Sequence, residues 1–208
     1  VGGVGCLSNR KAPARFYTQD EIREIVAYAA ERHIEVIPEI DLPGHSLAFN
    51  KVFPEFDAGH RTVNPAKEGL YEVLETIMTE LADLFPGRYI HIGGDEVETD
   101  GWRARADIPP FMKREGIKSY DDIQKYFERR LSDIVYKTGK TVVAWDEVLS
   151  AGLDNSKTVL YWWRGSRPEV MEQCFAEGYR TVLCSWKAFY LDYAQDNRCT
   201  KGQLAHLG

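Results

Sequence analysis

The sequence is 208 residues long, 44% hydrophobic and 28% charged, which is the balance of a folded globular domain rather than of a disordered chain. Its formal net charge of -6 is spread along the chain without a lysine- and arginine-rich run, and this argues against nucleic acid as a partner. No apolar stretch approaches the ~20 residues of a membrane-spanning helix, so we expect no membrane partner either.

The first predicted unit is a helix followed by a strand. Thr18 and Glu21 have the spacing of a capping box, and apolar residues follow them at helical intervals. A β-rich run over 35–40 comes next and is ended by Pro43 and Gly44. We therefore expect a helix from Thr18 and a strand over 35–40.

The same unit then repeats along the chain. Asn64-Pro65 has the pattern of a helix start, and it precedes a clean apolar stripe. A strand is predicted over 89–92, and Gly93-Gly94 terminates it.

A third unit begins at Ser119, which with Asp122 has the pattern of a helix N-cap. The helix leads to a strand predicted over 141–145. Another strand, over 158–163, follows with little room for a full helix between the two.

The last predicted elements are a helix from Pro168 to Gly178 and a strand over 181–184. Alternating strands and helices indicate an α/β protein with a parallel sheet. The repetition favours a (β/α)8, or TIM, barrel over a doubly wound sheet, because no Gly-x-Gly-x-x-Gly follows a strand.

About five strands are predicted, whereas a closed barrel has eight. We therefore expect residues 1–208 to be one incomplete barrel domain, with at least two strands before residue 1 and at least one after residue 208. The sequence also lacks an initiator Met and a signal-peptide pattern at its start, as expected for an excerpt of a longer chain.

Barrel enzymes take their functional side chains from the carboxyl ends of strands and the loops that follow. Aromatic rings pack on the C–H faces of a sugar while carboxylates accept hydrogen bonds from its hydroxyls, so carboxylates framed by aromatics suit a carbohydrate. In chain order the candidates are Asp41, His45, Asp95, Glu96, Trp145, Asp146, Glu147, Trp162, Trp163, Arg164, Trp186, Tyr190 and Asp192.

The adjacent carboxylates Asp95 and Glu96 limit the mechanism. Most glycosidases place two carboxyl groups on either side of the scissile bond, whereas neighbouring residues leave the chain in different directions. If Glu96 is the general acid, the nucleophile comes from elsewhere, and the substrate's own 2-acetamido oxygen is one source. We also expect crowding of the two charges to raise one pKa, so that the pair titrates as a unit.

The segment His-Ile-Gly-Gly-Asp-Glu at 91–96 resembles the signature of glycoside hydrolase family 20, the β-N-acetylhexosaminidases. Segments 38–45, 144–147, 163–165 and 190–192 agree with the family in the same order, so the resemblance covers essentially the whole chain. It implies an exo-acting enzyme that removes terminal β-linked N-acetylglucosamine or N-acetylgalactosamine from an oligosaccharide or glycoconjugate. The implied reaction is substrate-assisted retaining hydrolysis without a cofactor or metal.

The resemblance also implies roles for the catalytic residues. Glu96 would protonate the leaving oxygen and later activate water, and His45 would hydrogen-bond with Glu96. Asp95 would hold the acetamido N–H and stabilise the positive charge of an oxazolinium-like intermediate. Tyr190 would donate to the acetamido oxygen.

For substrate binding, the resemblance implies that Trp145 and Trp163 wall the acetamido pocket and that Asp192 binds a sugar hydroxyl. The family's arginine on the first strand, aspartate on the second and tryptophan on the eighth have no counterpart here. We therefore expect the 208 residues alone to be inactive. The resemblance further implies a secreted, periplasmic or lysosomal protein, and the oligomeric state is left open.

Two alternatives remain: a non-catalytic sugar-binding barrel, and an ordinary two-carboxylate retaining glycosidase with its nucleophile on another strand. A metal site built from His45, His91, Asp95 and Glu96 is disfavoured because the residues lack His-x-x-x-His spacing. The four cysteines show no Cys-x-x-Cys spacing, which argues against a zinc ribbon.

Several candidates have ordinary structural interpretations. His91 lies in mid-strand between isoleucines and is expected to be a satisfied structural group. Asp146 and Glu147 look like the reactive pair, but a supporting role is favoured. Trp102, in a predicted loop, is a candidate for the aglycone side of the site.

Overall fold

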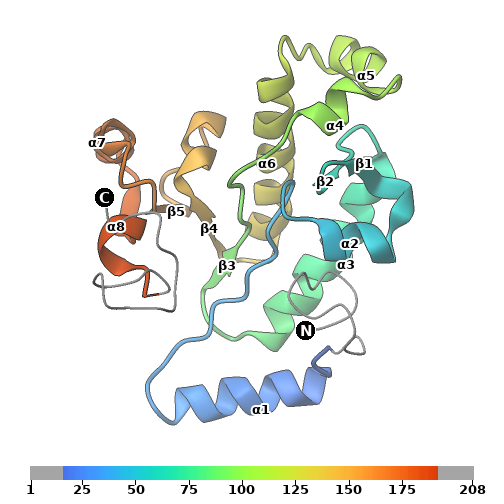
Figure 1. Ribbon diagram of the computed structural model, residues 1–208. Coiled ribbons are helices and arrows are strands. Elements are labelled where there is room, and N and C mark those ends of the chain that lie inside the picture. The colour runs from blue at the N-terminus through green and yellow to red at the C-terminus, as the bar shows by residue number, and fades with distance from the viewer. Residues whose placement is uncertain (1–15, 192–208) are drawn as a thin grey trace, which may run out of the picture.

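The computed structural model describes residues 16–191, and a four-stranded parallel sheet is at its centre. The strands are β3 (Tyr89–His91), β4 (Thr141–Trp145), β5 (Thr158–Trp162) and β6 (Arg180–Leu183), in the order β3-β4-β5-β6 (Figure 1). All four were predicted, and their ends differ from the predicted ones by one residue at most. The described part of the chain is therefore α/β with a parallel sheet, as expected.

Helices connect most of these strands. α3 (Glu68–Leu84) precedes β3, α6 (Tyr120–Lys137) directly precedes β4, and α7 (Pro168–Ala176) joins β5 to β6. The short connection from β4 to β5 holds only a 3-10 helix, η2 (Asp146–Ala151). The other elements are α1 (Gln19–Ala30), α2 (Leu47–Val52), η1 (Pro54–Phe56), the antiparallel strands β1 (Asp57–Gly59) and β2 (Thr62–Val63), α4 (Asp100–Arg103), α5 (Ile108–Glu115) and α8 (Trp186–Phe189). Within residues 16–191, none of the helices combines the length and apolar character that crossing a bilayer requires.

Two predicted helix starts are confirmed by their caps. The Thr18 hydroxyl accepts from the Glu21 N–H at 3.2 Å, while the Glu21 carboxylate accepts from the Thr18 N–H at 2.7 Å. The Ser119 hydroxyl likewise accepts from the Asp122 N–H at 3.2 Å. These contacts satisfy N–H groups that a helix start leaves without a backbone partner.

The helix predicted from Asn64-Pro65 begins later, at Glu68. The Asn64 side chain does not cap it: Oδ1 accepts from the Ala66 N–H at 3.1 Å, and Nδ2 donates to Asp107 at 2.9 Å. The side chain predicted to cap the helix, that of Asn64, is thus used in a tertiary contact with the distant carboxylate of Asp107.

The strand predicted over 35–40 is present only as one parallel bridge, between Glu39 and His91. The Ile40 N–H donates to the His91 carbonyl, and the His91 N–H donates to the Pro38 carbonyl. Pro38 has no N–H, so the ladder cannot extend one step back toward Tyr89. This segment nevertheless runs beside β3 and brings the residues after it to the same edge of the sheet.

The main core lies between the sheet and helices α3 and α6. Its fully buried side chains include Leu70, Leu74, Met78, Ile90, Phe127, Leu131, Val142 and Leu160. A smaller core under α4 and α5 holds Trp102, whose indole N–H donates to the Val63 carbonyl at 2.8 Å. Trp102 is therefore a core residue, and its predicted place beside the aglycone is wrong, because the short helix α4 turns the ring inward.

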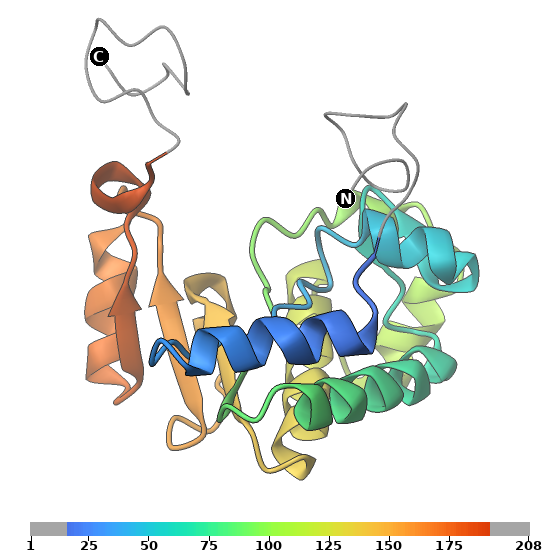
Figure 2. The same cartoon turned by 90° about the horizontal axis from the view of Figure 1, so that it is seen from below.

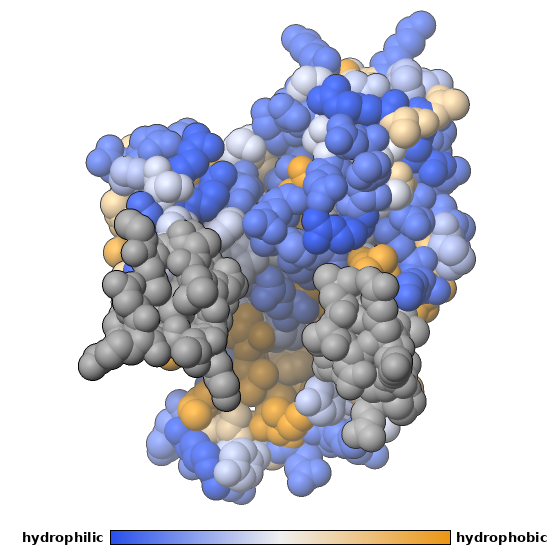
Figure 3. Space-filling view, in the orientation of Figure 1, coloured by the Kyte–Doolittle hydropathy of each residue, from blue (hydrophilic) through white to orange (hydrophobic). Residues whose placement is uncertain are grey.

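Apolar side chains remain exposed at the margins of the sheet. Val182 and Leu183 on β6 are 41% and 48% exposed, and α1 buries none of its residues although it carries an apolar face. Figure 2 shows α1 lying beside α3, where Gln19 donates to Glu80. Figure 3 shows apolar side chains gathered in the middle of one face, between α1 and β3. Exposed apolar surface of this kind is typical of sites where another protein segment, a partner or a ligand binds.

Candidate active site

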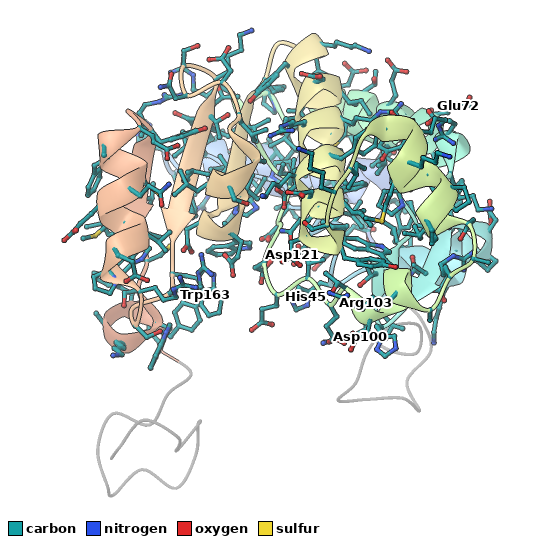
Figure 4. The ribbon with its side chains drawn as sticks, turned by 90° about the horizontal axis from the view of Figure 1, so that it is seen from above. His45, Glu72, Asp100, Arg103, Asp121 and Trp163 are labelled. Atoms are coloured by element: carbon teal, nitrogen blue, oxygen red, sulfur yellow. The ribbon has the colours of Figure 1, made fainter. Side chains whose placement is uncertain are left out.

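The predicted site residues gather at the carboxyl edge of the parallel sheet. Asp95 and Glu96 follow β3, and His45 follows the segment bridged to it. Trp145 is the last residue of β4, and Trp163 comes directly after β5. Figure 4 shows His45 and Trp163 at the same edge of the molecule.

One imidazole joins the two adjacent carboxylates. His45 Nε2 lies 3.4 Å from Asp95 Oδ2 and 3.4 Å from Glu96 Oε2. The Asp95 side chain is 17% exposed, whereas that of Glu96 is 55% exposed. The inner carboxylate is thus fixed within the protein, while the outer one is free to meet a ligand.

The backbone at both His45 and Glu96 is left-handed, with φ values of 47° and 49°. This conformation costs an L-residue about 1–2 kcal/mol, because Cβ crowds the carbonyl oxygen. Strain of this kind is concentrated at functional sites, where the surrounding structure holds it.

Two glycines let the loop after β3 approach the neighbouring segments closely. Both have positive φ, 73° at Gly93 and 98° at Gly94. A Cβ at Gly93 would lie 1.9 Å from Asp41 Oδ1, and one at Gly94 would lie 2.3 Å from a methyl of Val148. The Gly-Gly sequence is therefore required for the turn that presents Asp95 and Glu96.

Asp41 forms a close carboxyl pair with Asp95. Burial, then the negative charge of Asp95 and a hydrogen bond with it, raise the pKa of Asp41 from 3.8 to about 8. Asp95 Oδ1 is buried and has no hydrogen-bond partner among the described residues, and a carboxyl oxygen of Asp41 lies within 4.8 Å of a carboxyl oxygen of Asp95. The carboxyl group with the raised pKa is thus Asp41, because folding buries it and places its negative charge against that of Asp95.

Trp145 is held by a carboxylate on the neighbouring segment. Its indole N–H donates to Glu39 Oε1 at 3.0 Å, and its ring lies 4.9 Å from the His91 ring. Burial lowers the pKa of His91 to about 4, so this histidine is neutral. His91 Nδ1 accepts from the Gly93 N–H at 3.0 Å, in keeping with the expected structural role, although Nε2 finds no partner among the described residues.

Trp163 is held in a similar way by the start of η2. Its indole N–H donates to Glu147 Oε2 at 3.1 Å, and its backbone N–H donates to Asp146 Oδ1 at 3.3 Å. Asp146 is buried and accepts from Arg164 Nε at 2.8 Å. Asp146 and Glu147 therefore support Trp163, which agrees with the interpretation from the sequence.

Asp41, His45 and Asp95 could together bind a cation, because one potential ligand atom from each lies within 4.8 Å of those of the other two. Metal ligands bind in their deprotonated form, however, and Asp41 holds its proton up to a pKa of about 8. A cation bound here would therefore have to displace the proton of Asp41.

Comparison with known proteins identifies the fold family. The family model described as glycosyl hydrolase family 20, catalytic domain, matches residues 2–206. The chain belongs to glycosyl hydrolase family 20. The resemblance drawn from the 91–96 motif is thereby confirmed.

Several family 20 relatives are similar over most of this chain. It is 37% identical to a beta-hexosaminidase of Porphyromonas gingivalis over 160 residues, which are 71% of this chain and 21% of that protein. It is also 37% identical to a beta-hexosaminidase of Vibrio furnissii over 195 residues, or 87% of this chain and 32% of that one. The chain therefore spans between a fifth and a third of the length of these relatives.

A solved family 20 structure has the same fold. The crystal structure of an exo β-N-acetylglucosaminidase from Vibrio harveyi, in complex with N-acetylglucosamine, matches with a TM-score of 0.75 at 34% identity. The match covers 83% of this chain and 29% of that one.

In this family 20 chain, the structure brings together only some of the predicted site residues. His45, Asp95 and Glu96 form one cluster, to which Asp41 is added. Within residues 16–191 the hydrogen bonds of Trp163 go to Asp146 and Glu147, not to Asp95 or Glu96, and the pocket walled by two tryptophans stays a prediction. Tyr190 is half-buried at the end of α8, and Asp192 lies outside the described residues.

Proposed function

We propose that the protein containing this chain is an exo-acting β-N-acetylhexosaminidase that uses substrate-assisted retaining catalysis. The observation that carries the proposal is the position of His45 Nε2, 3.4 Å from both Asp95 Oδ2 and Glu96 Oε2 at the carboxyl edge of the sheet. Family 20 membership, and relatives named beta-hexosaminidase at 37% identity, support it.

The different exposure of the two carboxyl groups suits different roles. Glu96, the outer one, protonates the glycosidic oxygen as the acetamido oxygen attacks the anomeric carbon and the C–O bond breaks. Asp95, the inner one, accepts a hydrogen bond from the acetamido N–H and stabilises the positive charge of the oxazolinium ring. The Glu96 carboxylate then takes a proton from the water that attacks the anomeric carbon, and the acetamido group is restored.

The remaining site residues are proposed to bind the sugar. Trp145 and Trp163 wall the acetamido pocket, each with its indole N–H fixed by a glutamate. Tyr190 donates to the acetamido oxygen, and Asp192 binds a sugar hydroxyl. The substrate is an oligosaccharide or glycoconjugate with a terminal N-acetylhexosamine, no cofactor takes part, and the protein acts in a secreted, periplasmic or lysosomal setting.

We also propose that the sheet is part of a (β/α)8 barrel, completed by strands from outside the described residues. The exposed Val182 and Leu183 on β6 support this, as does an apolar hollow of about 390 Å³ beside the opposite edge, lined in part by Leu42, Phe49 and Phe53. Residues 1–208 then form an incomplete catalytic domain, which explains the missing arginine, aspartate and tryptophan of the family site.

Comparing substrates with and without the 2-acetamido group tests the mechanism. We expect the complete protein to cleave an aryl N-acetyl-β-D-glucosaminide at least about 10³-fold faster, in kcat/KM, than the matching aryl β-D-glucoside, because only the former carries its own nucleophile. Similar rates on both substrates would favour the two-carboxylate alternative. Binding of N-acetylglucosamine without any hydrolysis would favour the non-catalytic barrel.

The Asp41 proton predicts an alkaline limit to activity. Because the pKa of Asp41 is raised to about 8, kcat/KM should fall as the pH rises through 8 and a second charge appears beside Asp95. The Asp41→Asn variant, which has no proton to lose there, should lack this limb, and an identical limb in both proteins would contradict the assignment. The raised pKa also makes the free energy of unfolding depend on pH. The contribution of protonated Asp41 to stability is complete below about pH 3.8, the pKa of the unfolded chain, and it is lost as the pH rises through about 8.

A further inference from the structure

The Gly94 carbonyl, directly before the Asp95–Glu96 pair, is held by a side chain from α6. Gln124 Nε2 donates to the Gly94 oxygen at 2.8 Å. The same nitrogen donates to Glu128 Oε1 at 2.5 Å, one turn further along the helix. Both hydrogens of the amide NH2 group are thus used, and the Gln124 side chain has a single orientation.

Glu128 lies directly beneath this loop. Its side chain is fully buried, and its Oε1 would be 3.2 Å from a Cβ placed on Gly94. Its Oε2 meets no hydrogen-bond partner among residues 16–191, so the contact with Gln124 is the polar interaction that offsets its burial. On the buried face of α6, Phe127 and Leu131 are apolar, whereas Ser132, one turn beyond Glu128, is polar and also fully buried. Burying a carboxyl group costs free energy unless it is hydrogen-bonded, and the hydrogen bond from Gln124 is what offsets this cost.

The Gly94 carbonyl belongs to the same planar peptide as the Asp95 nitrogen, so fixing the carbonyl fixes the direction in which Asp95 leaves the loop. Two further hydrogen bonds hold the other backbone groups of this turn. The Gly94 N–H donates to Asp41 Oδ1 at 3.2 Å, and the Gly93 carbonyl accepts from the Trp145 N–H at 3.0 Å. Immediately afterwards the chain enters the left-handed conformation of Glu96. A strained residue persists only where its surroundings define the backbone on several sides.

We propose that Gln124 and Glu128 are positioning residues for the acid pair, acting through the Gly94–Asp95 peptide without touching the substrate. Gln124 holds the carbonyl, and Glu128 orients the Gln124 amide. The expected effect on kcat rests on the proposed hydrolase function, whereas the restraint of the Gly94–Asp95 peptide by Gln124 does not.

The Gln124→Met variant tests the hold, because methionine has a similar length and no N–H. In the complete protein we expect kcat to fall by about 10–100-fold with little change in KM, since a displaced acid loses transition-state geometry rather than affinity. We also expect faster amide hydrogen exchange over residues 94–97. The matched control is Gln173→Met: Gln173 on α7 donates to Glu177 Oε1 at 2.7 Å with the same spacing, but on the surface, and its loss should change neither measurement.

Two substitutions at Glu128 separate positioning from packing. Glu128→Gln keeps an acceptor oxygen in the same shape and should retain kcat near that of the wild type. Glu128→Leu fills the space without an acceptor and should reproduce the loss seen in Gln124→Met. If the residue served packing alone, the leucine variant would be at least as active and stable as the glutamine variant.

The outcomes distinguish this inference from the proposed function. Unchanged exchange over 94–97 in Gln124→Met, or full activity in Glu128→Leu, overturns the positioning role. A wild-type protein that hydrolyses no N-acetylhexosaminide overturns the proposed function, while faster exchange in Gln124→Met would still support the hold on the loop.

Discussion

Replacing Glu96 by glutamine should lower kcat on a nitrophenyl N-acetyl-β-D-glucosaminide by about 10²–10⁴-fold, the usual contribution of a positioned general acid. Glutamine keeps the shape of the side chain and its proximity to His45 but has no proton to give to the leaving oxygen. Steady-state kinetics of the purified complete protein measure the effect, and circular dichroism checks that the variant is folded.

The leaving group makes this prediction specific to acid catalysis. A more acidic aryl alcohol departs without protonation, so the loss in Glu96→Gln should shrink as the leaving-group pKa falls. The control is Glu98→Gln: Glu98 lies two positions on, is ion-paired with Arg61, and its side chain is 43% exposed. An equal loss for all leaving groups, or an equal loss in Glu98→Gln, would remove Glu96 from the acid role.

Replacing Asp95 by asparagine should lower kcat by about 10²–10³-fold, because a preorganised charge beside the oxazolinium ring is lost. Asparagine also presents an N–H where the acetamido N–H needs an acceptor. The affinity for a cyclic thiazoline analogue of the intermediate should therefore fall with kcat. An unchanged affinity would contradict a contact between Asp95 and the acetamido group.

The pairing of Asp95 with Asp41 adds a second criterion. If Asp41 acts through Asp95, the double variant Asp41→Asn/Asp95→Asn should lose little more than Asp95→Asn alone, since the two residues work as a unit. Independent roles would make the losses multiply. Asp100→Asn is the control, because Asp100 follows the same loop and its side chain is 74% exposed.

Much of the fold followed from local pattern. Caps at Thr18 and Ser119 and the strands from position 89 onward were predicted, because helix and strand periods record which face of each element is buried. The strand over 35–40 and the helix start at Asn64 were misplaced. In each case a distant partner, or a missing N–H at Pro38, outweighed the local preference.

The sequence by itself determined the order of β/α units, the Gly-Gly turn that ends in two adjacent carboxylates, and the family to which they belong. Only the tertiary structure decided that Asp41 is buried against Asp95, which raises the pKa of Asp41, and that Gln124 reaches the Gly94 carbonyl. The physical reason is that these contacts join segments far apart in the chain. Burial, which shifts the pKa of Asp41 and makes the Gln124 contact necessary, exists only once those segments have packed.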